Sequence, residues 1–295
     1  MRMVLAALVG LTLPLSLSPA LAEPGPADCA ALAALVRDFT GYEVKAPPAG
    51  PADGWCVLDG ARLISTRSDQ PGLKVDTLRI RGEADGDTVT ALDVSATGLR
   101  LVQGLGAKHR DEQLQAMVRL QSGDLALRAG VNPTADRLEI RGFALVLSGG
   151  TEIALDADLA GATLSPLGVA AGRLTGLTLD WKADGRLMRG AMEAMGTGID
   201  DRLTGAEAIK AARTGLQTVI DALPIEDESR HALSAMAASL PEARGTLRLS
   251  FHSDEGIGAA DLLVAGLGKS PLRDRLASLF AASRLQTVWS QGLQP

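Results

Sequence analysis

The sequence predicts an α+β protein in which a curved, mostly antiparallel β-sheet of repeated hairpins packs against a helical segment and a C-terminal helix. Three observations lead to this fold class. A strand-like block recurs later in the chain, apolar and polar residues alternate with a period of two, and two later segments change to a helical period. Only 3% of residues are aromatic against 46% hydrophobic, so the core must consist mainly of aliphatic side chains.

The first 22 residues have the pattern of a secretory signal peptide. Arg2 supplies the positive charge, an apolar stretch follows, and Ala20 and Ala22 form a small-x-small cleavage site. Because Pro14 and Pro19 interrupt the stretch and it is short for a membrane span, we expect cleavage after Ala22 and export to the periplasm. No Cys follows directly, so no lipid anchor is expected, and charged residues interrupt every later apolar run, which predicts no transmembrane segment.

Residues 23–56 are predicted to form an N-terminal helix inside a disulfide-closed segment. Asp28 suits the N-cap of a helix from Cys29 to Asp38, and Gly41 suits its end. The chain contains two cysteines, Cys29 and Cys56, and an oxidising compartment favours a disulfide between them. Two unpaired buried thiols are the alternative.

The third segment, residues 57–295, is predicted to be a β-rich domain, and its main evidence is an internal repeat. The sequence Asp-Thr-Leu-Arg-Ile-Arg-Gly at 76–82 recurs as Asp-Arg-Leu-Glu-Ile-Arg-Gly at 136–142, with five of seven positions identical. Turn residues follow each copy, at 85–87 and 149–150, and a second alternating stretch follows each turn. Each copy therefore predicts a hairpin whose apolar side chains, including Leu92, Val94, Leu155 and Leu159, share one face of the sheet.

Two glycines, Gly98 and Gly161, occupy equivalent places near the ends of the second strands, where the alternation breaks. We expect a bulge or bend at both. Further strands are predicted at 57–66, 113–128 and 173–183, together with a hairpin from Thr246 to Ala265 that turns at 254–256.

The helical period returns in two places. The first is an insertion at 186–241, where Thr204 and Glu207 form a capping box that opens a helix to about Leu223. Pro224 separates it from a second helix at 226–240. The second place is a C-terminal helix at 270–289, with Ser270 as N-cap and Pro271 in the first position. We expect these helices to cover the apolar face of the sheet.

The residue patterns predict no enzyme, no cofactor and no metal site. The sequence contains no nucleophile-elbow motif and no phosphate-binding glycine loop. His252 with Asp254 and the carboxylates Asp93, Asp156 and Asp158 are the candidates for acid-base chemistry, but a solvated strand face explains them without catalysis and is the preferred interpretation. The net charge of −6 with interspersed charges argues against nucleic acid as a partner.

The repeated strand pairs at 78–82 and 91–101 make the region 57–184 resemble the AsmA-like superfamily and related periplasmic β-repeat families of alphaproteobacteria. This resemblance implies a curved sheet that handles lipids, and it assigns no functional residue.

Two functional hypotheses remain open. In the first, the exported protein binds a lipid or another apolar ligand between the sheet and the helices, with Leu92, Val94, Leu155 and Leu159 lining the site. In the second, it is a structural or assembly factor of the cell envelope that acts through a protein partner. The sequence does not determine the ligand, the partner or the oligomeric state.

Overall fold

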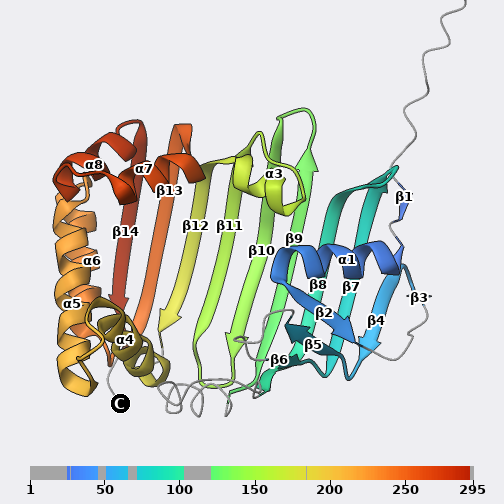
Figure 1. Ribbon diagram of the computed structural model, residues 1–295, viewed down its shortest axis with the longest axis horizontal. Helices are drawn as coiled ribbons and strands as arrows, with labels where there is room; N and C mark the ends of the chain where they lie inside the picture. Colours follow the sequence, from blue (N-terminus) through green and yellow to red (C-terminus); the bar gives the residue numbers. More distant parts are fainter. Residues whose placement is uncertain are drawn as a thin grey trace, which may run out of the picture.

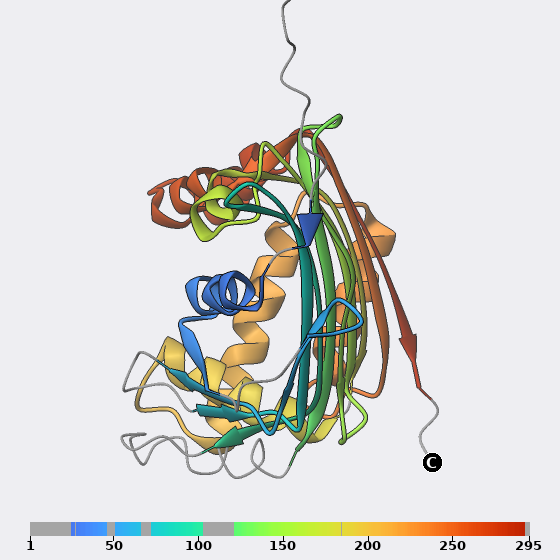
Figure 2. The same cartoon turned by 90° about the vertical axis from the view of Figure 1, so that its right-hand side faces the viewer.

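The computed structural model describes residues 25, 26, 28–45, 51–65, 72–102, 121–183 and 185–292. They form a curved, open β-sheet whose pairings are all antiparallel, with helices on its concave side and at one end (Figures 1 and 2). The fold class predicted from the sequence is confirmed. The predicted signal peptide, residues 1–22, lies outside the described residues.

The described residues form fourteen strands: β1 (Gly25–Pro26), β2 (Tyr42–Lys45), β3 (Pro51–Ala52), β4 (Trp55–Asp59), β5 (Arg62–Ser65), β6 (Gly72–Lys74), β7 (Thr77–Asp85), β8 (Thr88–Val102), β9 (Gly123–Asn132), β10 (Arg137–Leu147), β11 (Glu152–Ala160), β12 (Arg173–Ala183), β13 (Gly245–Gly258) and β14 (Ser283–Gln291). The helices are α1 (Cys29–Thr40), α3 (Pro166–Ala171), α4 (Gly185–Ile199), α5 (Gly205–Ala222), α6 (Asp227–Ser239), α7 (Ala259–Leu267) and α8 (Leu272–Leu279).

The two copies of the sequence repeat are the hairpins β7–β8 and β10–β11, as predicted. The strands run in the order β14-β13-β12-β11-β10-β9-β8, and β7 pairs with the first part of β8. The predicted period-two alternation appears as alternating burial of the side chains along β8. Leu92, Val94 and Ala96 are buried on one face of β8, and the residues between them are less buried.

The predicted bend in β8 occurs at Gly98. The register of β8 with β9 shifts between Ala96 and Leu99, and Gly98 has a φ of 64°. Beyond the bend, Leu101 pairs with Leu73 of β6, and β5 and β2 continue this smaller sheet. The bend therefore turns the end of β8 toward the concave side, where these strands lie below α1 (Figure 2).

Gly98→Ala is expected to lower the free energy of unfolding by about 2 to 4 kcal/mol. The backbone conformation disfavours an L side chain, and a Cβ would lie 2.1 Å from Asp76 Oδ2, so Asp76 would have to move away from its ion pair with Arg100. Gly86→Ala is the matched control, because Gly86 has a φ of 58° with open space around it. Urea denaturation should show a clearly larger loss for Gly98→Ala, and equal losses would contradict the steric role of Asp76.

The helices follow the sequence signals at most of their ends. The side chain of Asp28 accepts a hydrogen bond from the backbone N–H of Ala31, and Gly41 ends α1 in the left-handed conformation. Helices α5 and α6 are separated near Pro224, as predicted. The capping box predicted at Thr204 is not formed, because its side chain makes no cap hydrogen bond.

Four predictions of strands, helices and bends are wrong in whole or in part. The predicted helix at 270–289 is α8 followed by strand β14, and the predicted hairpin at 246–265 is the single strand β13 followed by α7. The stretch 57–66 contains two strands, β4 and β5, which are separated at Gly60. Gly161 ends β11 and does not bend it, and the first part of the predicted strand at 113–128, residues 113–120, lies outside the described residues.

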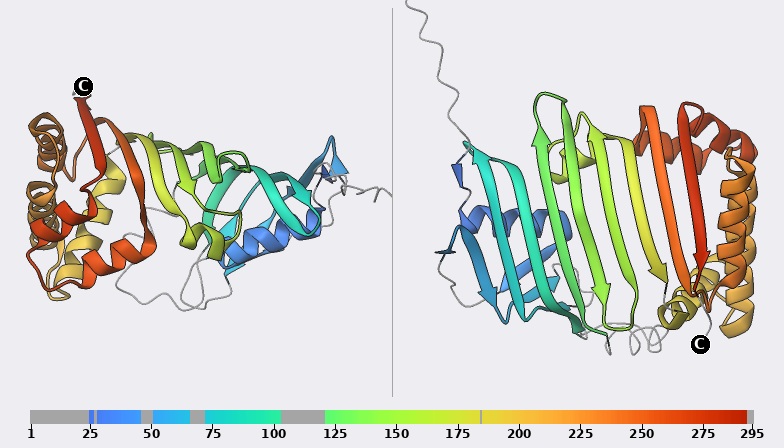
Figure 3. Two further views of the ribbon diagram at one scale, coloured as in Figure 1. Left: turned by 90° about the horizontal axis from the view of Figure 1, so that it is seen from above. Right: turned by 180° about the vertical axis from the view of Figure 1, so that it is seen from behind.

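The hydrophobic core consists of two clusters at opposite ends of the sheet. The first joins α1 to β4–β10 and contains the deeply buried Leu32, Ile80 and Leu138. The second joins α4, α5 and α6 to the ends of β12, β13 and β14 and contains the deeply buried Met192. Thr287 of β14 is buried there, and its hydroxyl donates to the carbonyl oxygen of Ser229 in α6. Figure 3 shows α5 and α6 at the β14 end, far from α1.

Candidate apolar binding site

An apolar cavity of about 440 Å³ lies between α1 and the concave face of the sheet, and we call it the α1 cavity. Its lining residues are Leu35, Val36, Phe39, Thr40, Leu63, Leu73, Val75, Leu78, Leu92, Val94, Ala96, Leu99, Leu125, Leu127, Ala129, Leu138, Ile140, Phe143, Leu164 and Val169. Thr40 alone among them has a polar side chain, and its hydroxyl donates to the Val36 carbonyl within the helix. A ligand in the cavity would therefore contact hydrocarbon side chains and would find no free hydrogen-bonding group.

Four parts of the fold enclose this cavity. Strands β7–β10 contribute the sheet face, and α1 lies over it with Leu35, Val36 and Phe39. The bend at Gly98 brings β5 and β6 to one end, where Leu63 and Leu73 complete the wall. The segment around α3 contributes Leu164 and Val169 at the other end (Figures 1 and 2). The enclosure thus depends on segments that are far apart in the sequence.

Helix α1 is held in place by covalent and packing contacts. The predicted disulfide between Cys29 and Cys56 is confirmed, and it joins the first residue of α1 to β4. One turn later Leu32 is only 1% exposed and lies against Gly82 of β7, where an added Cβ would come within 2.7 Å of it. Both contacts hold the N-terminal end of α1 against the sheet, and the cavity-lining Leu35, Val36 and Phe39 follow in its later turns.

The apolar face of the sheet continues beyond the α1 cavity, and we call this part the central apolar face. It consists of side chains that belong to neither core cluster and are each half-buried: Leu145, Leu147, Ile153, Leu155, Leu177, Leu179 and Leu249. The strand register aligns Phe143 with Leu155, Leu155 with Leu179, and Leu179 with Leu249. A row of hydrocarbon therefore crosses four strands from the cavity toward α6.

The predicted ligand-binding residues occupy three different environments. Leu92 and Val94 line the α1 cavity. Leu159 packs against the first core cluster, opposite Leu138, and Leu155 lies on the central apolar face. Helices α1 and α3 cover Leu92 and Val94. The helices at 186–241, which were predicted to cover these residues, pack at the opposite end of the sheet.

The sequence-based prediction did not include α1 among the elements that line the apolar site. Its signal is the spacing of Leu32, Leu35, Val36 and Phe39, which places four apolar side chains on one helical face.

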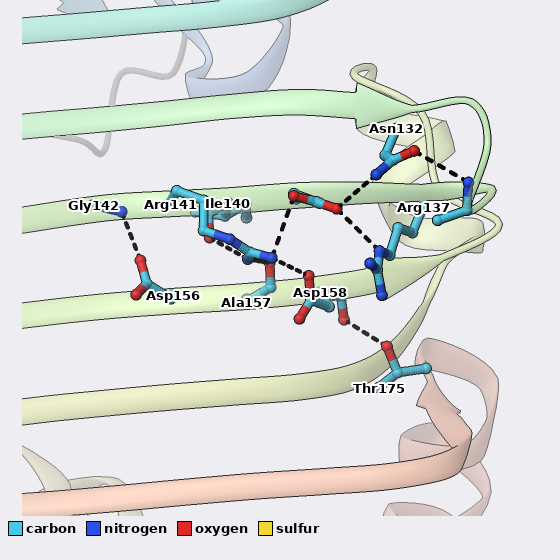
Figure 4. Close-up of polar contacts among 11 residues, drawn as sticks. Asn132, Arg137, Ile140, Arg141, Gly142, Asp156, Ala157, Asp158 and Thr175 are labelled. Carbon is cyan, nitrogen blue, oxygen red and sulfur yellow. Dashed lines mark hydrogen bonds and ion pairs between the residues drawn. The ribbon is translucent and has the colours of Figure 1, made fainter.

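The opposite face of the sheet is polar and carries a network of ion pairs (Figure 4). Arg141 donates to Asp158 at 2.6 Å and lies 3.3 Å from Glu139. This hydrogen bond to Asp158 is the main reason why the pKa of Arg141 is raised. Glu139 accepts hydrogen bonds from Asn132 and Arg137, and the Asn132 bond is the largest cause of its lowered pKa. The second hairpin is thus held by charged bonds on the side away from the cavity.

The other carboxylates considered for chemistry have similar partners. Asp93 pairs with Arg81 at 2.8 Å and Asp156 accepts from the backbone of Gly142. His252 and Asp254 lie 3.2 Å apart, both mostly exposed to solvent. Within the described ranges, no three His, Cys, Asp or Glu side chains cluster in a way that could hold a metal ion. These arrangements support ion pairing and provide no enclosed reaction site.

The Glu139 network predicts a small acid-dependent loss of stability. Because the folded pKa of Glu139 lies below its unfolded value, its contribution is present above about pH 4.3 and is lost as the pH falls through the folded pKa. Glu139→Gln should therefore lower the free energy of unfolding by under about 1 kcal/mol at neutral pH, since the site is solvent-screened. Denaturation of wild type and Glu139→Gln at neutral pH and near pH 3 checks this. A difference in the free energy of unfolding between the two proteins that grows on acidification would contradict it.

The sequence matches no family model and no curated protein. None of the helices in the described part of the chain is long and apolar enough to span a bilayer.

Proposed function

We propose that this protein is an exported, non-enzymatic binding protein of the periplasm that holds the hydrocarbon part of a lipid, or another apolar ligand, in the α1 cavity. The observation that carries the proposal is a cavity of about 440 Å³ whose lining offers no free polar group. Ligand sites commonly measure about 300 to 1,000 Å³, and a dry apolar cavity of about 150 Å³ is enough to bind benzene. A hydrocarbon chain is the occupant that such a surface favours.

The central apolar face supports the same proposal. A ligand longer than the cavity can continue along the row from Phe143 to Leu155 and Leu179, whose side chains are half-buried. Covering these side chains would remove further apolar area from water, at about 25 cal/mol per Å². The AsmA-like resemblance of the hairpin repeat also points to lipid handling.

Two features support export. The first 22 residues have the order of a signal peptide, and a disulfide closes the N-terminal segment, as is common in oxidising compartments. Expression of the full chain in a bacterial host should yield periplasmic protein whose intact mass corresponds to a chain that begins at Glu23. Cytoplasmic protein with an uncleaved N-terminus would contradict this part.

The binding proposal is tested on the same purified protein. Organic extraction and mass spectrometry should recover lipid, and delipidated protein should enhance the fluorescence of cis-parinaric acid, with displacement by oleic acid. If no lipid is recovered and no fluorescent fatty acid is taken up, the binding proposal is wrong. The alternative of an envelope assembly factor acting through a protein partner would then be preferred.

A further inference from the structure

The most exposed large apolar side chains of the described residues are concentrated on two short helices. Leu167 of α3 is 85% exposed, and on α7 Leu267 is 82%, Val264 73% and Leu263 65% exposed. No other large apolar side chain in the described ranges exceeds 59%. We call these four side chains, with Leu262 of α7, the apolar rim.

The two helices lie at the same edge of the sheet. Helix α3 connects β11 to β12, and α7 follows β13, so both leave the sheet where neighbouring strands end. Arg173, just after α3, forms an ion pair with Asp261 of α7 at 2.9 Å and also donates to the carbonyl of Gly256. Figures 1 and 2 show both helices projecting from this edge on the concave side. The two parts of the rim therefore lie along the same edge of the sheet, on its concave side.

The apolar rim is also connected to the α1 cavity. Val169 and Leu164 line the cavity at its α3 end, and Leu167 of the same helix points its hydrocarbon to solvent. Helix α3 thus carries both a cavity-lining side chain, Val169, and a rim side chain, Leu167.

Charge next to the rim favours one kind of partner. The segment 268–275, which follows α7, contains Lys269, Arg273 and Arg275 against the single acid Asp274, in a chain whose formal net charge is −6. Lys269 and Arg273 are exposed and form no ion pair within the described part of the chain. Aliphatic side chains beside exposed cations suit the interface of a bilayer with anionic headgroups.

We infer that the apolar rim docks on the surface of an anionic phospholipid bilayer, with the leucines of α3 and α7 inserted among the acyl chains. Docking there would place the α3 end of the α1 cavity against the membrane, and ligand would pass between bilayer and cavity at this end. The exchange of ligand rests on the proposed binding function, whereas docking rests on the rim alone.

The experiment measures flotation of the purified chain with vesicles of phosphatidylcholine, with and without phosphatidylglycerol. Wild type should float with vesicles that contain phosphatidylglycerol. The triple variant Leu167→Gln, Leu263→Gln, Leu267→Gln should lose at least about tenfold in partition, because each Leu withdrawn from hydrocarbon weakens binding substantially. Lys269→Gln with Arg273→Gln should lower binding only to the anionic vesicles.

The matched control is Val146→Gln with Val288→Gln, which removes exposed apolar side chains from the polar face. It should float like wild type. Wild type and all variants are expressed with the same N-terminal residues, so any contribution of residues 1–22 to flotation is the same for each protein. Absence of vesicle binding by wild type, or equal flotation of the rim variant, would overturn the inference.

Fatty acid uptake without vesicles separates this inference from the proposed function. The rim variant should take up cis-parinaric acid like wild type, because the replaced side chains do not line the cavity. Uptake without vesicle binding by wild type would overturn membrane docking alone. Vesicle binding without uptake would overturn the binding function and leave docking intact.

Discussion

Filling the α1 cavity with two aromatic rings is expected to weaken fatty acid uptake strongly while the protein stays folded. Ala96 and Ala129 are 5% and 4% exposed, lie on the neighbouring strands β8 and β9, and both line the cavity. In Ala96→Phe with Ala129→Phe, each ring would occupy space that is otherwise open to ligand. Overpacking a filled core costs about 1 to 3 kcal/mol, and the cavity reduces that cost here.

The expected loss of cis-parinaric acid affinity is at least about tenfold, because ligand and rings would compete for the same contacts. The control variant Ala126→Phe with Ala154→Phe makes the same two changes on exposed positions of β9 and β11, on the polar face of the sheet. It should bind like wild type. Unchanged uptake by the cavity variant, with an unchanged melting temperature, would place the ligand outside the α1 cavity.

The hairpins could be predicted because their signals are local. In β8, Leu92, Val94 and Ala96 alternate with polar residues, and Gly86 and Gly98 have the positive φ that a turn and a bulge require. The same alternation identified Leu92 and Val94 as inward-facing. Such features depend only on neighbouring residues, so one sequence is enough to find them.

Strand β14 could not be predicted because its burial pattern depends on a distant helix. Leu285 and Trp289 face inward, but Thr287 lies between them, and a buried Thr breaks the apolar alternation. Its hydroxyl is satisfied by the carbonyl of Ser229 in α6, and its backbone N–H donates to the Ser229 hydroxyl. Only the tertiary structure reveals that this position is internal.

The end of β13 was also mispredicted because it depends on a contact with a residue distant in the sequence. Gly256 suggested a hairpin turn, and it has a φ of 69°. The strand nevertheless continues to Gly258, because Arg173 of β12 donates to the carbonyls of Glu255 and Gly256 and holds them at the sheet. The cover of the α1 cavity depends on distant contacts too, since a disulfide and the Leu32–Gly82 contact hold α1 at the sheet, where Leu92 and Val94 line the cavity.

Loss of the Cys29–Cys56 disulfide is expected to lower the free energy of unfolding by roughly 3 to 4 kcal/mol, since the bond closes a loop between residues 27 positions apart. Cys29→Ala with Cys56→Ala is the suitable variant, because Cys56 is 6% exposed in the core and Ser would bury a hydroxyl there. The loss should also weaken fatty acid uptake, since α1 carries Leu35, Val36 and Phe39 of the cavity wall.

Urea denaturation with and without reductant measures this effect. Reductant should shift the unfolding midpoint of wild type to lower urea and leave that of the double variant unchanged, which assigns the shift to this bond. A wild-type midpoint that does not respond to reductant, with thiol titration proving complete reduction, would show that packing of Leu32 against Gly82 holds α1 without the disulfide. The cover of the cavity would then depend on non-covalent contacts alone, and Leu32→Ala, with an expected cost of about 2 to 5 kcal/mol, would become the change that releases it.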